Sequence, residues 1–357
     1  MIKWWNTNFG YDEVNATSKA ILNKKIGQGD IVNKLENEIA KIVDCKYGVA
    51  CNSGSSALLM ALMSSNITKS DEVIIPNRTW IATAHAVCLA GAKPIIVDVQ
   101  KHIPIASSEE ILKNISPKTK AIINVHLNGR YAYTDKLLKF CKAKGIIIIE
   151  DACQALLSQN NKIKIGSEGD IGCYSFGMTK LISGGGGGIA VTNNKKLFQK
   201  MRMIRNHGVE DQFTESWNCV GFNFKYSDVL ASIALTQLDR RTEIIENVLK
   251  TYDHYKSTLS KSNNINLLEI DTKAGNIPLY IEIETENRDN LVKYLYDKKI
   301  QVRVVPPNIS SSEYLISKSK YPNSKYFQDK SIYVPCGPDQ SIENLNLVSE
   351  ALLNYGK

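Results

Sequence analysis

The sequence predicts an α/β protein with a mainly parallel sheet, followed by a smaller C-terminal α+β domain. Short apolar runs alternate with helical patterns through the first half of the chain, which is typical of strand–helix–strand crossover units. The runs are almost continuously apolar, as expected for parallel strands buried on both faces. The length of 357 residues suits about two domains.

The expected elements of the first half are a strand at 72–76, a helix at 79–90, strands at 93–99 and 120–127, a helix at 134–144 and a strand at 145–150. Two further β-like runs, at 170–176 and 188–192, flank a glycine-rich loop.

The apolar spacing turns helical from residue 226 to about 255, a long stretch able to link two domains. Beyond it we expect strands at 277–283 and 300–305 and helices at 287–298 and 342–355. We therefore divide the chain into a large domain of residues 1–240 and a small α+β domain of residues 241–357. The N-terminal segment is a candidate to pack with the small domain.

The composition, with 43% hydrophobic and 22% charged residues, excludes wholesale disorder. No apolar run approaches the roughly 18 residues of a membrane span. The first residues carry Asp12 and Glu13 and no apolar core, unlike a signal peptide. We expect a soluble, cytoplasmic protein without a membrane partner.

The net charge of +8 does not point to nucleic acid, because only 8 of the 44 basic residues are Arg and no dense basic tract occurs. The eight cysteines form no C-x-x-C pair, and the five histidines form no H-E-x-x-H motif. We expect reduced thiols in a reducing compartment and no metal site.

Three segments could carry chemistry, and the first is Asn52-Ser53-Gly54-Ser55-Ser56 before an apolar helix. Free backbone N–H groups, hydroxyls and the positive end of a helix together form a phosphate cradle. A plain serine N-cap is the alternative interpretation.

The second segment is Glu150-Asp151 at the end of an apolar strand. Ligands of parallel sheets bind beyond the carboxyl ends of the strands, so a carboxylate at this position faces the site. An acid that merely caps the next helix is the alternative.

The third segment places Lys180 between a strand and five consecutive glycines, 184–188. Glycines allow unusual backbone angles and close approach of a ligand, whereas a flexible linker beside a solvated lysine is the alternative. The run does not fit G-x-G-x-x-G, since residue 189 is Ile, and the sequence contains no P-loop motif.

A phosphate cradle, a strand-end Asp and a Lys about thirty residues later are together what pyridoxal 5'-phosphate (PLP) chemistry requires. With these motifs the chain resembles the DegT/StrS-type sugar aminotransferases, a branch of the fold-type-I PLP-dependent enzymes, from residues 31–36 to 321–341. The resemblance implies a large domain with a seven-stranded type of sheet. It also implies a homodimer with two shared active sites.

The resemblance implies a role for each matching residue. Lys180 corresponds to the Schiff-base lysine and proton shuttle, and Asp151 to the partner of the pyridine nitrogen. The other expected cofactor-binding residues are Gly54, Ser55, Ser56 and Ser175 at the phosphate, Trp80 on the ring face, Gln154 near the ring hydroxyl, and Asn223, which reaches the neighbouring subunit's phosphate. A core aromatic and a helix-surface amide are the alternatives for Trp80 and Gln154.

The departures from the family pattern concern the substrate side. The chain has Gly177-Met178, Asn128 and Lys225 where the family has His-Pro, an aromatic residue and Arg. Arg303, Tyr131 and Tyr133 are candidate replacement contacts.

We expect transfer of an amino group, from L-glutamate by resemblance, to a nucleotide-linked keto-sugar. A small phosphorylated ketone is the alternative acceptor. A non-catalytic PLP-binding regulator is the remote alternative, and dehydration is disfavoured because a sister group that dehydrates has His in place of the lysine.

Overall fold

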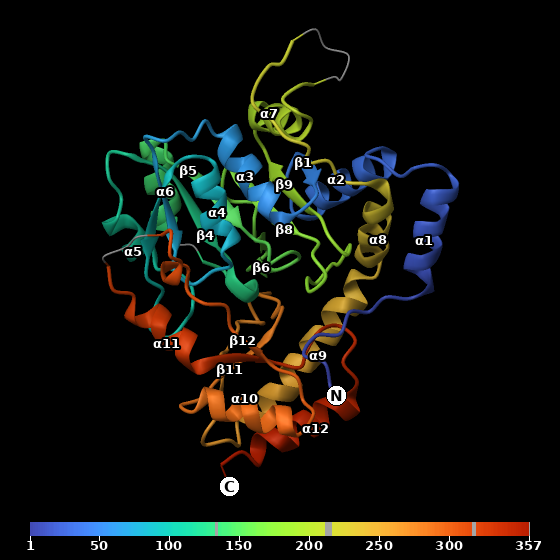
Figure 1. Cartoon of the computed structure of the whole chain (residues 1–357), viewed down its shortest axis with the longest axis vertical. Coiled ribbons are helices and arrows are strands. Elements are labelled where there is room, and N and C mark those ends of the chain that lie inside the picture. Colours follow the sequence, from blue (N-terminus) through green and yellow to red (C-terminus); the bar gives the residue numbers. More distant parts are fainter. Residues whose placement is uncertain (133–134, 211–215, 316–318, 357) are drawn as a thin grey trace.

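A seven-stranded sheet forms the centre of the protein, in the order β1-β9-β8-β5-β4-β2-β3 (Figure 1). The computed structural model describes residues 1–132, 135–210, 216–315 and 319–356. The strands are β1 (Tyr47–Cys51), β2 (Glu72–Pro76), β3 (Lys93–Val97), β4 (Thr119–Val125), β5 (Ile147–Asp151), β8 (Ile171–Ser175) and β9 (Gly188–Thr192). Strands β3, β2, β4, β5 and β8 pair in parallel, whereas β9 is antiparallel to both of its neighbours. The predicted mainly parallel α/β sheet is confirmed.

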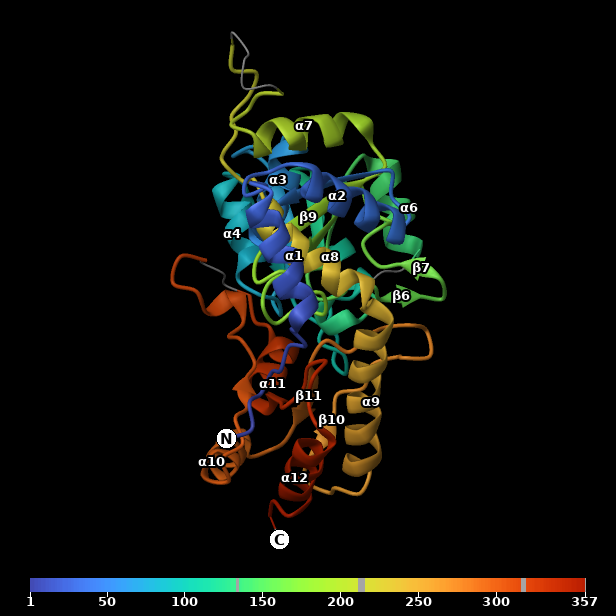
Figure 2. The same ribbon diagram turned by 90° about the vertical axis from the view of Figure 1, so that its right-hand side faces the viewer.

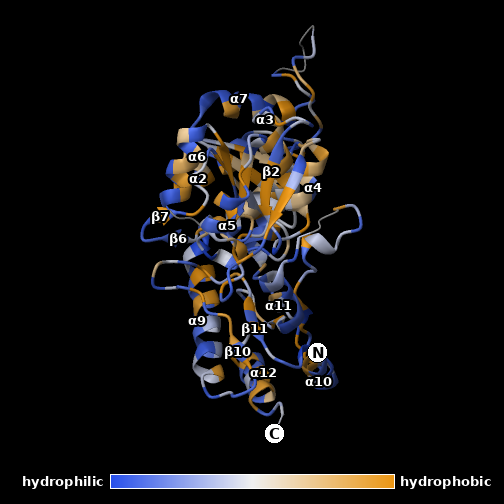
Figure 3. Ribbon diagram, turned by 90° about the vertical axis from the view of Figure 1, so that its left-hand side faces the viewer, coloured by the Kyte–Doolittle hydropathy of each residue, from blue (hydrophilic) through white to orange (hydrophobic). Residues whose placement is uncertain are grey.

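Helices cover both faces of this sheet, which explains its uninterrupted apolar strands. Ile74, Ile122 and Ile148 face α5 (Ser108–Lys113) and α6 (Asp135–Lys144). The alternate residues of the same strands, such as Ile75 and Ile149, face α3 (Gly54–Ser64), α4 (Ala82–Leu89) and α7 (Lys195–Arg205). Successive side chains of a strand point to opposite faces, so both sets are buried. Figure 3 shows the hydrophobic colour concentrated in these strands.

The β1–β9 end of the sheet is covered by α2 (Asp30–Ile42) and α8 (Asp228–Asp239), and α1 (Tyr11–Leu22) packs along α8 (Figure 1). A short hairpin of β6 (Gln159–Asn160) and β7 (Ile163–Lys164) projects between the two sheets of the protein (Figure 2). Among the helices of the described ranges, none combines the length and apolarity needed to cross a membrane.

The C-terminal part contains a second, antiparallel sheet in the order β10-β11-β13-β12. Its strands are β10 (Asn266–Leu267), β11 (Ile281–Glu284), β12 (Arg303–Val304) and β13 (Ser331–Val334). The helices of this part are α9 (Arg241–Leu259), α10 (Arg288–Asp297), α11 (Pro322–Lys330) and α12 (Ile342–Leu353). A short 3-10 turn, Ile309–Ser311, also belongs to this part, whereas the other one, Leu127–Gly129, follows β4 of the large sheet. A division into domains at residue 240 stays a proposal, which the presence of two separate sheets supports.

The helical stretch predicted from 226 to about 255 is two helices rather than one. Arg240 ends α8 and precedes α9, with φ −93° and ψ 13°. Its guanidinium pairs with Glu13 and donates to the carbonyl of Asn8 at 2.9 Å. The break therefore occurs where the segment before α1 is fastened to α8.

The first residues of the chain lie beside the C-terminal part, and the chain then runs to α1 at the large sheet (Figure 2). Ile2 forms a bridge with Ile300, and Trp5 forms one with Cys336. The side-chain amide of Asn6 donates to the backbone carbonyl of Asp339 at 2.7 Å. Residues 2–6 thus extend the C-terminal part of the structure.

One buried ion-pair cluster joins the two sheets. Glu282, on β11, accepts from Arg78 at 3.2 Å and from Arg130 at 3.3 Å. Arg78 follows β2 and Arg130 follows β4, so both arginines come from the carboxyl edge of the large sheet. All three side chains are at most 5% exposed. Arg78 and Arg130 also donate to the carbonyls of Pro306 and Leu268.

We expect Glu282→Gln to lower the free energy of unfolding by about 3–5 kcal/mol, because it leaves two buried guanidinium groups without their counter-charge. Urea denaturation followed by circular dichroism measures this loss. Asp329→Asn, which breaks an exposed pair with Lys325, is the control and should leave the stability nearly unchanged. Equal effects of the two substitutions would contradict the assignment.

Candidate active site

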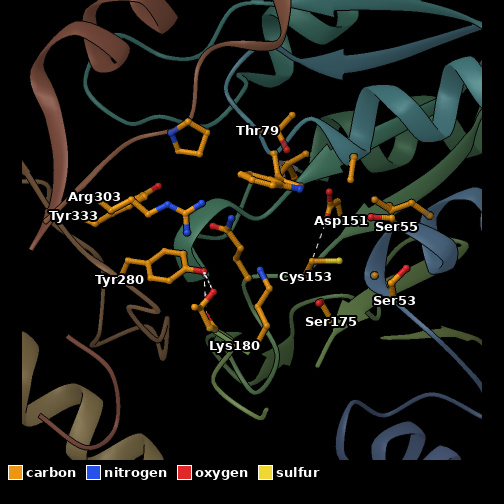
Figure 4. A pocket seen from close by; sticks show the side chains of 18 residues that line it. Ser53, Ser55, Thr79, Asp151, Cys153, Ser175, Lys180, Tyr280, Arg303 and Tyr333 are labelled. Atoms are coloured by element: carbon orange, nitrogen blue, oxygen red, sulfur yellow. Dashed lines mark hydrogen bonds between the residues drawn. The ribbon is translucent and has the colours of Figure 1, made fainter. Parts of the chain in front are cut away.

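A cavity of about 270 Å³ lies between the carboxyl edge of the large sheet and the second sheet (Figure 4). Val125, Asp151 and Ser175, the last residues of β4, β5 and β8, line it together. Because these strands are parallel, their carboxyl ends meet at one edge, as expected for an α/β ligand site. The second sheet and its flanking loops contribute Tyr280, Arg303, Pro306 and Tyr333.

The cavity brings together most of the residues that the sequence singled out. Those that line it are Gly54, Ser55, Trp80, Asp151, Gln154, Ser175 and Lys180. Ser56 and Asn223 are not among its lining residues. Trp80 is 48% exposed, so it is not the core aromatic of the alternative interpretation.

The first turn of α3 forms one end of the cavity. Ser53 caps the helix, with its hydroxyl accepting from the amide of Ser56 at 3.1 Å. The Ser56 hydroxyl donates to Asn52 at 2.6 Å, which accounts for its place outside the lining. Ser53, Gly54 and Ser55 remain at the cavity, next to the positive end of the helix. The serine N-cap and the anion site are therefore features of the same turn.

Gly54 is required at this turn by close packing. A Cβ atom at this position would lie 2.8 Å from Cys153 Sγ and 2.9 Å from Ser175 Cβ. Both neighbours also line the cavity. Any side chain at residue 54 would displace them.

Asp151 is held by a chain of hydrogen bonds from α4. Its Oδ2 accepts from the Thr83 hydroxyl at 2.8 Å, and its Oδ1 accepts from the amide of Cys153 at 3.2 Å. The Thr79 and Thr83 hydroxyls are 2.9 Å apart. An ionised carboxylate can only accept hydrogen bonds. The Thr83 hydroxyl therefore donates a hydrogen bond to Asp151 and accepts one from the Thr79 hydroxyl. The carboxylate is thus fixed at the base of the cavity, 6% exposed.

The neighbouring acid, Glu150, points away from the cavity and has a structural role. Its two oxygens accept from the amides of Gly166, Glu168 and Gly169 at 2.6–2.8 Å, and from His126 Nε2 at 2.9 Å. The other ring nitrogen of His126 accepts from a backbone amide, so Nε2 carries the proton that goes to Glu150. Alternation along β5 therefore separates the acid of the cavity from the acid of the core.

Cys153 also lines the cavity, but its thiol is not activated. Burial, and then the nearby charge of Asp151, hold its pKa well above the usual range. Its Sγ lies 3.6 Å from the carbonyl oxygen of Cys173. The residue fills space between Gly54 and Asp151.

The loop that carries Lys180, residues 176–187, is tightly fastened. Phe176 N donates to Gly187 O, and Gly184 N donates to Phe176 O, both at 2.9 Å. Gly187 has φ +107°, and a Cβ on it would lie 2.5 Å from the ring of Tyr226. The glycines therefore serve a close approach of the backbone to Tyr226, and the flexible-linker alternative is wrong.

Two further contacts hold the residues just before Lys180. The Tyr280 hydroxyl donates to the carbonyl of Thr179 at 3.1 Å, and the Thr7 hydroxyl donates to the carbonyl of Met178 at the same distance. In Figure 4, Lys180 and Tyr280 point into the same space from different elements. No hydrogen bond of the described residues uses Lys180 Nζ, so this amine is available to a ligand.

Asn128, which the sequence analysis placed on the substrate side, is instead a structural link. It is fully buried, with φ +55°. Its side chain donates to Tyr280 O at 2.9 Å and accepts from Tyr280 N at 2.7 Å. Its amide donates to Gln154 Oε1 at 2.9 Å, so Gln154 is no surface amide. An aromatic residue could not form this reciprocal pair.

The other candidates for substrate contacts differ in their positions. Tyr131 is not a lining residue, because its hydroxyl donates to Glu168 at 2.6 Å and its ring stacks on His126. Tyr133 lies outside the described residues. Lys225 is outside the lining, beside the exposed Asn223. Of the replacement contacts, only Arg303 is placed at the cavity.

The sequence analysis missed Thr83, Tyr280 and Tyr333. Thr83 carried a weak signal, since it follows Thr79 by one helical turn in a segment expected to be a helix. The two tyrosines belong to the second sheet, and their position at the cavity depends on strand pairing that no local pattern reveals. Among the residues that the structure describes, no cluster of metal-ligating side chains occurs.

Comparison with known proteins identifies this constellation. Residues 8–353 match the model of the DegT/DnrJ/EryC1/StrS aminotransferase family. The chain belongs to this family. The resemblance inferred from the motifs is confirmed, and with it the fold type, the PLP cofactor and the transaminase activity.

Among its relatives, the aminotransferase is similar to GDP-perosamine synthase of Escherichia coli O157:H7, at 29% identity over 92% of this chain and 91% of that protein. It is 30% identical to a pleiotropic regulatory protein of Geobacillus stearothermophilus, over 96% of this chain and 92% of that one. The structure of S. venezuelae DesV in complex with a ketimine intermediate superposes with a TM-score of 0.92, at 26% identity, covering 97% and 94% of the two chains.

The residues of the aminotransferase cavity fit PLP. The turn at Gly54 excludes a side chain and offers a helix N-terminus together with the Ser55 and Ser175 hydroxyls, which suits a phosphate. Asp151 is oriented by hydrogen bonds, and Lys180 Nζ faces the same space.

We expect Gly54→Ala to reduce the PLP content of the purified protein and to destabilise it by about 1–3 kcal/mol, since the added methyl group overpacks Cys153 and Ser175. PLP absorbance and urea unfolding measure the two effects. Gly186→Ala is the matched control, because no atom lies within 4 Å of the added Cβ. A Gly54→Ala protein with normal PLP content would refute this view of the turn.

Proposed function

We propose that the protein transfers the amino group of L-glutamate to the ketone of a nucleotide-linked keto-sugar. The convergence of Lys180, Asp151 and the Ser53–Ser55 turn on one cavity carries this proposal. The relative named GDP-perosamine synthase, similar along nearly the whole chain, supports a nucleotide-sugar acceptor.

We assign the cofactor contacts within this proposal. The first turn of α3, with Gly54, Ser55 and Ser175, binds the phosphate. Trp80 would cover the face of the ring, and Gln154 would lie near the ring hydroxyl. Ser56 supports the turn through Asn52 rather than touching the phosphate directly. Each of these residues apart from Ser56 lines the cavity, which supports the assignment.

PLP, when bound, supplies an electron sink for negative charge at the α-carbon of an amino acid. Asp151 pairs with the protonated ring nitrogen, and a charge-assisted contact of this kind contributes roughly 1.5–3 kcal/mol. Thr83 and the Cys153 amide keep the carboxylate oriented during the reaction. Lys180 would hold the cofactor through its Nζ atom, and the same amine would move a proton during the reaction.

A homodimer with two shared active sites is part of the proposal. Asn223 is exposed, outside the lining of the cavity of its own chain, and is therefore available to a neighbouring subunit. The exposed apolar side chains of Trp217, Val220 and Phe222 lie in the same segment and support burial there. A monomeric mass in solution with full PLP affinity would contradict it.

We also propose a cytoplasmic location and no nucleic-acid or membrane partner. The eight cysteines of the chain suit a reducing compartment, which supports this location. Detection of the native protein outside the cytoplasmic fraction would refute the location.

Lys180→Ala should still bind PLP, because the phosphate site and Asp151 remain, but should lose turnover by several orders of magnitude. Absorbance of the purified variant and a coupled assay of glutamate-dependent amination measure the two properties. Lys164→Ala, at a lysine of the β6–β7 hairpin outside this cavity, is the control for the loss of one lysine. Wild-type turnover by Lys180→Ala would remove the central assignment.

The acceptor class is tested by titrating the glutamate-treated enzyme with GDP and UDP in competition with keto acceptors. A nucleotide-sugar enzyme should be inhibited at or below millimolar concentrations, since the nucleotide supplies much of the binding energy. Failure of every nucleoside diphosphate to compete would favour a small phosphorylated ketone. A PLP spectrum that does not respond to L-glutamate at all would favour a non-catalytic regulator.

A further inference from the structure

Arg303 stands out in the cavity as a cation without a counter-charge. It lines the cavity from β12, and within the described ranges its guanidinium takes part in no ion pair or hydrogen bond. A guanidinium has five N–H donors in a planar fork that matches carboxylates and phosphates. An unused guanidinium at a substrate cavity is therefore a candidate for binding an oxyanion.

The register of the second sheet fixes where this side chain points. Arg303 pairs with Tyr333 across β12 and β13, and Tyr333 pairs with Glu282 across β13 and β11. Directly opposed residues share one face of an antiparallel sheet, so the three side chains form a row. Figure 4 shows Arg303 and Tyr333 entering the cavity from the same side, with Lys180 beyond them.

The acid in this row cannot neutralise Arg303. Both oxygens of Glu282 are used by Arg78 and Arg130, at 3.2 Å and 3.3 Å. Three guanidinium groups thus accompany one carboxylate in and beside this row, and of these four charged groups only Arg303 lines the cavity. The surplus of positive charge, in partly buried surroundings, favours an anionic ligand.

Two indole rings hold the guanidinium in place. Its central carbon lies 5.0 Å from the ring centroid of Trp4 and 5.7 Å from that of Trp80. Cation–π contacts of this kind orient the group without using its N–H donors. Trp4 is itself fixed, because its carbonyl accepts from Cys336 N at 2.8 Å.

We propose that Arg303 binds the anionic group of a substrate, a carboxylate or a phosphate, opposite Lys180. The inference rests on the proposed aminotransferase reaction and adds a specificity-determining residue to it. The oxyanion belongs either to the dicarboxylic amino donor or to the diphosphate of the acceptor. In either case the rings of Trp4 and Trp80 hold the guanidinium of Arg303 in position before the substrate binds, and the substrate supplies the missing negative charge.

The test measures binding of two probes to the PLP-loaded protein by isothermal titration calorimetry at low salt. Glutarate represents the donor carboxylates, and GDP represents the acceptor diphosphate. We expect Arg303→Met to weaken one of the probes by about 10- to 100-fold, as for the loss of a charge-assisted bidentate contact. Weaker binding of glutarate would show that Arg303 binds the amino donor. Weaker binding of GDP would show that it binds the acceptor.

Controls separate this inference from the function that it rests on. Arg202→Met removes an exposed arginine that lies 5.6 Å from the ring of Phe198, and should change neither affinity. Arg303→Lys keeps the positive charge but lacks the planar guanidinium, so it should bind the affected probe with intermediate affinity. If Arg303→Met does not fold, Arg303→Lys alone provides the test.

Unchanged affinities in Arg303→Met, or a wild-type protein that binds neither probe, would overturn the inference. Failure of the proposed function is recognised separately, by a wild-type PLP spectrum that does not respond to L-glutamate. A half-reaction with L-glutamate gives a further readout. If Arg303 binds the donor, Arg303→Met should raise the concentration needed for half-maximal rate more than it lowers the maximal rate.

Discussion

The position of the second sheet depends on the ion-pair cluster of Glu282 with Arg78 and Arg130. These three buried side chains tie β11 to the carboxyl edge of the large sheet, where β2 and β4 end. A buried carboxylate between two guanidinium groups tolerates little displacement, because each partner would be left uncompensated. The cluster therefore sets the separation of the two walls of the cavity. Through the β-sheet register it also places Tyr333 and Arg303 opposite the residues of the large sheet.

On the other wall, the two adjacent acids at the end of β5 divide their tasks by strand alternation. Glu150 fixes the turn at residues 166–169, and Asp151 faces the cavity. The hydrogen bonds from Thr83 and the Cys153 amide then orient the Asp151 carboxylate before any ligand arrives. Such preorganisation lowers the reorganisation that a charged ring would otherwise require.

Local sequence patterns predicted every strand of the large sheet except β1, together with the motifs at the strand ends. The strands at 72–76 and 188–192 have the predicted bounds, since each is a short apolar run between clear breaks. Lys180 and Asp151 were predicted because each lies in a contiguous motif next to a strand end. The break between α8 and α9 at Arg240 was not predicted, and the role of Asn128 was misjudged, because both depend on contacts with distant residues. The same limitation hid Tyr280, whose place depends on how the second sheet docks.

The segment at residues 2–6 has a consequence for biosynthesis. Asn6 is hydrogen-bonded to Asp339, 333 positions later in the sequence, and Trp5 bridges to Cys336. A ribosome releases the early residues long before their partners exist, and a contact of such separation closes late. The indole of Trp4 consequently waits for its contact with Arg303 while the 298 residues between them are synthesised. Nascent chains that already contain Lys180 and Asp151 therefore still lack one wall of the cavity until Tyr280, Arg303 and Tyr333 have been synthesised.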